Sequence, residues 1–187
     1  MAKWEVLKSQ IALTAGFFRL RIDECKLPDG RVMPRYHVFE FPDWVNVVAV
    51  TPDGKMVLVR QYRHAAGEEF LEIPGGGTDP KQHEDPQTGG ARELLEETGY
   101  EAGEWVSCGF QYPNPALQNN RMHVFLALGC KKMSEPKLDP FEDLTVELKP
   151  VGEVMRLWEN GFFKHSLISS SLGLARRHLI ERGLLPS

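Results

Sequence analysis

Three carboxylates lie close together in the segment ARELLEETGY, residues 91–100. At about 100° per residue, Glu93, Glu96 and Glu97 fall within an arc of about 100° on one face of a helix. Like charges at i,i+4 cost roughly 0.2–0.5 kcal/mol per pair, and the segment contains no lysine to offset them. Mg²⁺ prefers oxygen ligands such as carboxylates. A solvated acidic face and a site for a divalent cation are both consistent with this segment alone.

The ends of this helix are well marked in the sequence. Asp85 suits the N-cap, Pro86 suits the first helical position, and Gly99 suits the C-cap. Gly89 and Gly90 lie inside the helix, where each costs roughly 0.5–1 kcal/mol relative to Ala. Sequences usually break local rules in this way at functional or tightly packed sites. The residues predicted to face a core on the opposite side of the helix are Ala91, Leu94, Leu95 and Thr98.

The rest of the chain predicts strands before this helix, and both strands and helices after it. Strands are predicted within residues 4–41 and at 44–50, 56–62, 70–74, 104–111, 122–130 and 144–148. The turn TPDGK joins 44–50 to 56–62 in a hairpin, and GGGTDPKQHE (75–84) is predicted to be a loop. Helices are predicted at 151–160 and 166–182. This order indicates an α+β fold, an α/β/α sandwich with a mixed central sheet between helices and an N-terminal antiparallel β subdomain.

Composition restricts the class of protein. The 187 residues suit one domain with a small N-terminal appendage, and the net charge of −4 provides no basic field for nucleic acid. Cys25, Cys108 and Cys130 fit neither a disulfide framework nor a zinc site, and they indicate a reducing compartment, which we take to be the cytoplasm. The N-terminus lacks the apolar run of a signal peptide, and no stretch approaches 18 apolar residues, so no membrane span is expected.

The segment from Glu84 to Tyr100 resembles the signature of the Nudix hydrolases, G-x5-E-x7-R-E-U-x-E-E-x-G-U, where U is aliphatic or aromatic. The matched positions are Glu84, Arg92, Glu93, Leu94, Glu96, Glu97, Gly99 and Tyr100. The sequence departs from the signature at Thr78, where the family has glycine, and the nearest glycines are Gly77 and Gly76. This departure leaves open which glycine forms the turn before the helix.

Longer segments are similar to the ADP-ribose pyrophosphatases within that family. They are RQYRHAAGEEFLEIPGGG (60–77), Pro115 and LDPFEDLTVELKPVGEV (138–154), so the resemblance covers most of residues 36–182. It implies a hydrolase domain at 41–187 and a β-rich region at 1–40 that forms a homodimer. The loop NPALQNNR (114–121) replaces the usual PGxS-type loop of the subfamily, so the resemblance leaves the exact substrate open.

The resemblance implies Mg²⁺-dependent hydrolysis of the diphosphate linkage in ADP-ribose or a related ADP-sugar, with Mn²⁺ able to substitute. Glu93 and Glu97 would be the main metal ligands, and Glu96 would hold a second metal or a metal-bound water. The backbone carbonyl of Gly75 would complete the set. Arg92 would orient these ligands through its planar guanidinium, and Glu84 would anchor the loop against the helix.

Other charged residues are candidates for binding the substrate. Arg60 and Arg63 are three apart on one strand and face opposite sides, so one can bind the diphosphate while the other makes a structural pair. Glu72 could hold the substrate base or pair with an arginine. For a general base or an extra metal ligand, Glu142 is favoured over Asp143, although both could be solvated loop carboxylates.

Several alternatives stay open at this point. A hydrolase of another nucleoside diphosphate sugar, such as GDP-mannose, would carry the same signature. A Nudix module that senses a nucleotide without cleaving it is disfavoured because all three carboxylates are present. An RNA-cap hydrolase is disfavoured by the net charge of −4. The expected partners are therefore a nucleoside diphosphate sugar and a second copy of the chain, with neither nucleic acid nor membrane.

Overall fold

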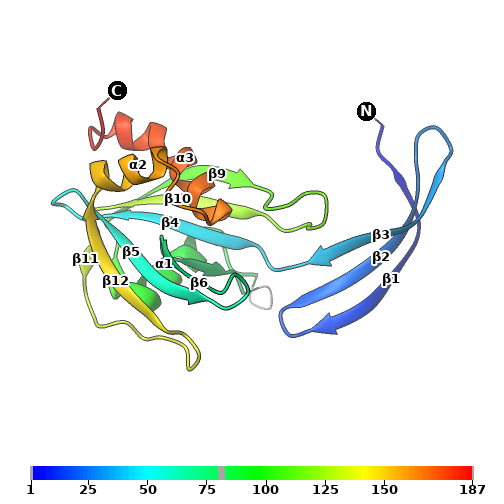
Figure 1. The fold of residues 1–187 in the computed structure, drawn as a ribbon, viewed down its shortest axis with the longest axis horizontal. Helices are drawn as coiled ribbons and strands as arrows, with labels where there is room; N and C mark the ends of the chain where they lie inside the picture. Colours follow the sequence, from blue (N-terminus) through cyan, green and yellow to red (C-terminus); the bar gives the residue numbers. More distant parts are fainter. Residues whose placement is uncertain (1, 80–82, 187) are drawn as a thin grey trace. The chain divides into compact units, whose positions relative to one another are not determined.

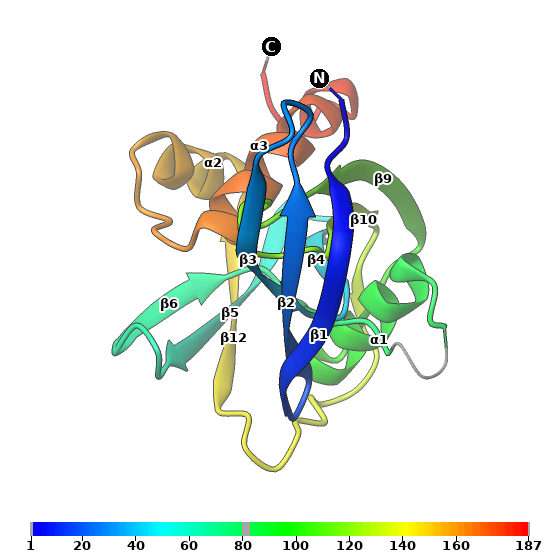
Figure 2. The same ribbon diagram turned by 90° about the vertical axis from the view of Figure 1, so that its right-hand side faces the viewer.

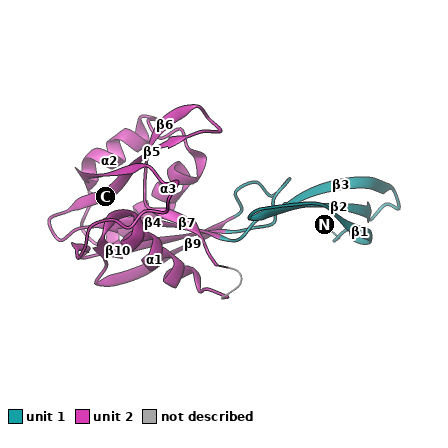
Figure 3. Cartoon of the chain, turned by 90° about the horizontal axis from the view of Figure 1, so that it is seen from below, with its two compact units in different colours: residues 1–43, 112–121 teal, residues 44–111, 122–187 magenta. Residues whose placement is uncertain are grey.

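The computed structural model of the chain describes residues 2–79 and 83–186. Its contacts divide the chain into two compact units, coloured separately in Figure 3. Unit 1 consists of residues 1–43 and 112–121, and unit 2 consists of residues 44–111 and 122–187. No helix in the described part of the chain is long and apolar enough to cross a membrane.

Unit 1 contains a three-stranded antiparallel sheet in the order β1-β2-β3 (Figure 2). Its strands are β1 (Glu5–Ala15), β2 (Phe18–Lys26) and β3 (Val32–Glu40). Ala15 pairs with Phe18, so a tight turn joins the first two strands. The sheet is antiparallel as predicted, and its first strand exposes nearly all of its side chains.

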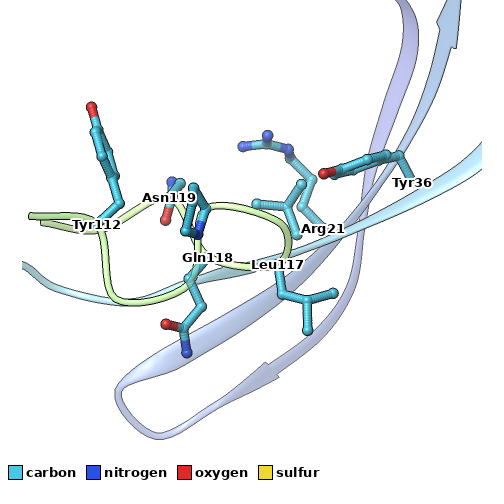
Figure 4. Close-up of a pocket in the computed structure, with 8 residues that line it drawn as sticks. Arg21, Tyr36, Tyr112, Leu117, Gln118 and Asn119 are labelled. Atoms are coloured by element: carbon cyan, nitrogen blue, oxygen red, sulfur yellow. The ribbon is translucent and has the colours of Figure 1, made fainter. Parts of the chain in front are cut away.

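The segment 112–121 packs against β3 within unit 1. The amide of Phe39 donates to the carbonyl of Leu117 at 2.7 Å, and the hydroxyl of Tyr36 donates to the carbonyl of Ala116 at 2.8 Å. Strands and segment together line a cavity of about 340 Å³ (Figure 4). The residues labelled around it in Figure 4 are Arg21, Tyr36, Tyr112, Leu117, Gln118 and Asn119. Among the described residues, those that line this cavity include none of the predicted site residues.

The main sheet of unit 2 has the order β12-β5-β4-β10-β9, with β6 paired to β5 and β7 paired to β4. The strands are β4 (Trp44–Val50), β5 (Lys55–Arg63), β6 (Glu68–Glu72), β7 (Gly75–Gly77), β9 (Glu104–Gln111), β10 (Met122–Leu128) and β12 (Leu144–Pro150). β4 and β10 are parallel and the other pairs are antiparallel, so the sheet is mixed as predicted. The short strands β8 (Tyr100–Glu101) and β11 (Lys131–Lys132) form a separate pair.

Helices cover both faces of this sheet (Figure 1). Helix α1 (Pro86–Thr98) packs on one face, where Val45, Val47 and Leu94 belong to one buried apolar cluster. Helices α2 (Val151–Glu159) and α3 (Ser166–Glu181) pack on the other, where Val48 and Val50 belong to a second cluster. Alternate residues of β4 thus enter different clusters, as the two-residue period of a strand requires. The predicted α/β/α sandwich is confirmed.

The ends of α1 follow the predicted signals. The side chain of Asp85 accepts hydrogen bonds from the amides of Gln87 at 3.1 Å and Thr88 at 3.2 Å. Gly99 ends the helix in the left-handed conformation, with φ of 76°, and its amide donates to the carbonyl of Leu95. A non-glycine residue rarely adopts this φ, so the helix ends sharply where the sequence predicts.

The buried side of α1 differs in part from the prediction. Leu94 and Thr98 are fully buried, but Ala91 is exposed and Leu95 is only partly buried. Glu97, predicted on the acidic face, is 5% exposed. The prediction fails because the acidic face also packs against protein: helix α1 contacts strand β7.

The loop predicted for residues 75–84 is wrong for its first three residues, which form β7 along β4. Glycine allows this close approach because it has no side chain: a Cβ on Gly75 would lie 2.4 Å from the carbonyl oxygen of Val45. The predicted β4–β5 hairpin is present, but only Ala49 with Val57 and Val50 with Met56 are paired across it. Farther along β4, β7 takes the place of β5. The predicted loop also includes residues 80–82, which lie outside the described residues.

Candidate active site

Helix α1 places Glu93 and Glu97 against β7, and Glu96 pairs with Arg92 on the same helix. Glu93 and Glu97 are largely buried, whereas the Glu96 side chain is 45% exposed. Leu94 packs in the cluster with residues of β4, and α1 also contacts β7, which covers part of its acidic face. Two buried carboxylates on one helical turn therefore lie against the glycine backbone of β7.

The glycines of β7 make this arrangement possible. The amide of Gly75 donates to Glu97 Oε2 at 3.0 Å. A Cβ on Gly76 would lie 2.1 Å from Glu93 Oε1, so any side chain there would displace the Glu93 carboxylate. The carbonyl of Gly77 accepts from Arg92 Nη2 at 3.1 Å. Each of the three glycines thus has a distinct contact, and the threonine at position 78 does not disturb them.

Arg92 links the helix to the segment before it. Its Nε and Nη2 donate to the two oxygens of Glu84 at 3.0 and 3.1 Å, and its Nη1 donates to Glu93 and Glu96 at 3.0 Å each. Glu84 Oε2 also accepts from the amide of Asp79 at 2.9 Å. The hydrogen bonds from Arg92 keep the pKa of Glu84 below its ordinary value despite partial burial. Glu84 therefore links the amide of Asp79 to Arg92 of the helix.

Two carboxyl groups of the site, those of Glu97 and Glu93, have raised pKa values. Burial raises the pKa of Glu97 to about 8, and the charges of Glu93 and Glu142 act in the same direction, while Arg63 and the Gly75 amide oppose them. Burial likewise raises the pKa of Glu93, against the opposing charge of Arg92. Glu142 therefore lies near enough to influence both carboxylates. It is half-buried, whereas Asp143 is exposed.

The two arginines of β5 pair with carboxylates on opposite sides. Arg60 donates to Glu147 at 2.5 Å and to Glu69 at 3.2 Å. Arg63 donates through Nε and Nη2 to the two oxygens of Glu72, at 3.1 and 2.5 Å. Glu72 thus pairs with an arginine, one of the two roles left open for it. Of the two arginines, Arg63 is the one whose charge lowers the pKa of Glu97.

His165 is a residue of the site that the sequence does not predict, and its Nδ1 lies 3.0 Å from Glu72 Oε1. The residues are 93 positions apart, so no local pattern could indicate the contact. The one available signal is weak: a histidine stands at the N-cap of α3, a position that usually holds Ser, Thr, Asp or Asn.

The donor set has the chemistry of a site for a hard cation. Within residues 2–79 and 83–186, no three His, Cys, Asp or Glu side chains by themselves enclose a possible metal position. Burial nevertheless raises the pKa values of Glu93 and Glu97, so a nearby positive charge would stabilise their ionised forms. A divalent cation would supply it, and carboxylate and carbonyl oxygens suit Mg²⁺ or Mn²⁺. Glu93 and Glu97, with Glu96 and the Gly75 carbonyl, are therefore compatible with such an ion.

Comparisons with known proteins agree with this picture. The sequence model of the NUDIX domain matches residues 41–168. An ADP-ribose pyrophosphatase of Mycobacterium tuberculosis is 30% identical over 181 residues, 96% of this chain and 86% of that protein. An ADP-ribose pyrophosphatase of Bacillus subtilis is 34% identical over 146 residues, 78% of this chain and 76% of that protein. A crystal structure of an ADP compounds hydrolase has the same fold, with a TM-score of 0.85 and 22% identity over 99% of this chain and 98% of that one.

The contact between Gly76 and Glu93 predicts the effect of one added methyl group. Gly76→Ala should lower the affinity for Mn²⁺ by more than about 10-fold, since the Cβ would displace a carboxylate of the site. The fold should persist because the displaced atoms are the end of a flexible side chain. Isothermal titration calorimetry with Mn²⁺ measures the affinity. Gly77→Ala is the matched control, as a Cβ there meets nothing within 4 Å. Equal affinity in both variants would contradict the assignment of Glu93.

The raised pKa of Glu97 predicts how the stability of the metal-free protein depends on pH. Between the ordinary value of 4.5 and about 8, the folded state binds more protons than the unfolded state. The free energy of unfolding should therefore fall as pH rises through this window, by at most roughly 1.4 kcal/mol per pH unit for this group. Urea unfolding in EDTA from pH 5 to pH 8 measures the slope. Glu97→Gln should flatten it, whereas exchanging the exposed Glu101 for Gln should not. An unchanged slope in Glu97→Gln would show that another group is responsible.

Proposed function

Because this chain belongs to the Nudix family, we propose that it hydrolyses the diphosphate linkage of ADP-ribose or a related ADP-sugar to AMP and a sugar phosphate. The observation that carries the proposal is the pair of buried carboxylates, Glu93 and Glu97, held beneath the glycines of β7. Two relatives named ADP-ribose pyrophosphatase support the choice of substrate. Hydrolysis of another nucleoside diphosphate sugar, such as GDP-mannose, would use the same carboxylates.

Nudix hydrolases generally need divalent metal ions. For this protein we propose Mg²⁺, with Mn²⁺ as a substitute, held by Glu93, Glu97, Glu96 and the carbonyl of Gly75. Such a cation neutralises the charge of the diphosphate and lowers the pKa of water. Arg92 keeps Glu93 and Glu96 in place through its hydrogen bonds, so that these ligands are oriented before any substrate arrives.

We propose that Arg63 binds the diphosphate and that Arg60 has a structural role. Arg60 donates to Glu69 on β6 and to Glu147 on β12, on the face of β5 opposite to that of Arg63. Arg63 uses Nε and Nη2 for Glu72, which leaves its Nη1 edge for a phosphate oxygen, and its side chain is 34% exposed. Arginine suits this role because its charge is permanent and its donors lie in one plane. In this arrangement Glu72 orients the arginine.

We propose that Glu142 accepts a proton from the attacking water. Its charge raises the pKa of both Glu93 and Glu97, which places it within electrostatic reach of the reacting groups. Its Oε2 accepts from the amide of Asp139 at 3.0 Å, and this contact fixes the loop that carries it. A general base must come within hydrogen-bond reach of the proton it takes, and a loop carboxylate can do so when substrate binds.

We also propose that the protein is a homodimer formed through unit 1. The exposed apolar residues of β1 are Val6, Leu7, Ile11 and Leu13. A strand with this pattern at the edge of a three-stranded sheet suits burial against a second copy. Light scattering should give a mass near twice 21.2 kDa, and Ile11→Lys should lower it toward that of one chain. A wild-type mass of one chain would refute the proposal.

We propose a cytoplasmic location. Cys25, Cys108 and Cys130 are all free, and Cys25 and Cys130 are buried. Reducing compartments keep thiols in this state. Fractionation of cells that produce the protein tests this location, and recovery from a secreted or periplasmic fraction would contradict it.

The activity is tested with a panel of ADP-ribose, GDP-mannose, UDP-glucose, NADH and a dinucleoside polyphosphate, each with Mg²⁺ or EDTA. We expect AMP from ADP-ribose only with Mg²⁺. Glu97→Gln should lower kcat by more than about 100-fold because a metal ligand is lost, whereas the control Glu101→Gln should retain activity. Preference for another nucleotide sugar would change the substrate and keep the mechanism. Binding without turnover of any compound would identify a sensor in place of an enzyme.

A further inference from the structure

The carboxylate of Glu72 is almost completely buried, with 1% of its side chain exposed. Three donors approach its two oxygens: Nε and Nη2 of Arg63 from β5, and Nδ1 of His165 from the start of α3. Oε1 receives both Arg63 Nε, at 3.1 Å, and His165 Nδ1, at 3.0 Å. Glu72 thus connects the guanidinium of Arg63 to the imidazole of His165 at the start of α3.

His165 occupies the N-cap of α3 without capping it. Its backbone has the extended conformation usual for an N-cap, with φ of −74° and ψ of 112°, but its side chain makes no hydrogen bond to the helix. Replacing a good cap by a residue that does not cap typically costs about 1 kcal/mol. The imidazole is directed at Glu72, and the ring of Phe70 packs edge-on against it at 6.1 Å. The N-terminus of α3 therefore lacks a stabilising side-chain cap, and the residue at that position contacts a distant buried carboxylate instead.

The contact determines which partner donates the hydrogen bond. Although burial alone would raise the pKa of Glu72, the hydrogen bonds from His165 and Arg63 keep that pKa below its ordinary value. Glu72 is therefore ionised and accepts, and Nδ1 of His165 carries the hydrogen. Without this donor, the carboxylate would be held only by the arginine that it has to orient, and both side chains could rotate together.

We propose that His165 is a positioning residue, which holds Glu72 so that Arg63 presents its Nη1 edge to the diphosphate. This inference rests on the proposed function, since it concerns the same site. A fork of two parallel hydrogen bonds fixes the plane of the guanidinium, and that plane fixes the direction of its remaining donors. A third hydrogen bond, from His165, fixes the carboxylate to which the fork is attached. Groups that support a reacting residue in this way typically contribute about 10- to 100-fold to activity.

Three variants of His165 separate positioning from a merely structural role. His165→Gln keeps an N–H donor, whereas His165→Phe keeps the ring contact with Phe70 and removes the donor. His165→Ser provides a good N-cap but cannot reach Glu72. If the residue only supports α3, Ser should equal or exceed the wild type. If it positions Glu72, kcat/KM for ADP-ribose should fall about 10- to 100-fold in the Ser and Phe variants and stay within about threefold in Gln.

A double-mutant cycle tests the route through Arg63. In an Arg63→Lys background the fork is absent, so adding His165→Ser should lower kcat/KM by less than about twofold. Melting temperatures show whether each variant folds, and His165→Phe replaces the Ser variant if that one does not. An additive loss in the Arg63→Lys background, an unimpaired Ser variant, or a Gln variant as impaired as Phe would each overturn the proposal.

Failure of the proposed function is distinguishable in the same experiment. If the wild type does not cleave ADP-ribose, the function is wrong, and the positioning role is then decided by calorimetric titration of the same variants with pyrophosphate and Mg²⁺. The dissociation constant should rise about 10-fold in the Ser and Phe variants and be retained in Gln. Equal affinity in all of them would overturn the positioning role.

Discussion

The arrangement of the site depends on one side chain, Arg92. Its guanidinium donates to Glu84, Glu93 and Glu96 and to the carbonyl of Gly77, and thus joins the acidic helix to the glycines above it. Close carboxylates repel one another strongly where water is excluded, and a permanent cation at their centre makes the cluster compatible with folding. Glu97 lies on the other side and is bonded by the Gly75 amide. Arg92 therefore offsets part of the negative charge on its own side of the cluster, and an added cation is most favourable on the side of Glu97.

The way in which β4 pairs with its neighbours determines where this cluster of carboxylates lies. β4 pairs with β5 at only two positions and then with the glycines of β7, so the two long strands diverge. The divergence admits the segment 74–77 beside β4 within the sheet, where the amide of Val47 donates to the carbonyl of Pro74 at 2.9 Å. Glycine is required there by the close approach of backbone and carboxylate. The packing of the sheet and the placement of the carboxylates thus depend on the same glycines of β7.

Local features of this protein could be predicted from its sequence, and contacts between distant segments could not. Asp85, Pro86 and Gly99 mark the ends of α1 because capping involves only neighbouring residues. The apolar run of β4 and the turn after it predict the first strand of a hairpin because both signals are local. By contrast, the burial of Glu97 depends on β7, and the contact of Glu72 with His165 joins a strand to a helix that is distant in the sequence. Periodicity describes which way a residue faces, and not what meets it there. The carboxylates of α1 were identifiable because their types and spacing are unusual in themselves.

The parallel pairing of β4 with β10 has a consequence for synthesis of the chain on the ribosome. β4 is the central strand of unit 2 and is almost wholly apolar, yet its parallel partner begins at Met122, about 70 residues after β4 ends. At about 5–20 residues per second, that interval lasts roughly 4–15 s. Throughout it, one edge of an apolar strand has no native partner, which is the condition under which unfinished sheets associate with one another. The nascent chain therefore depends on shielding of residues 44–50 until the second half of the protein emerges.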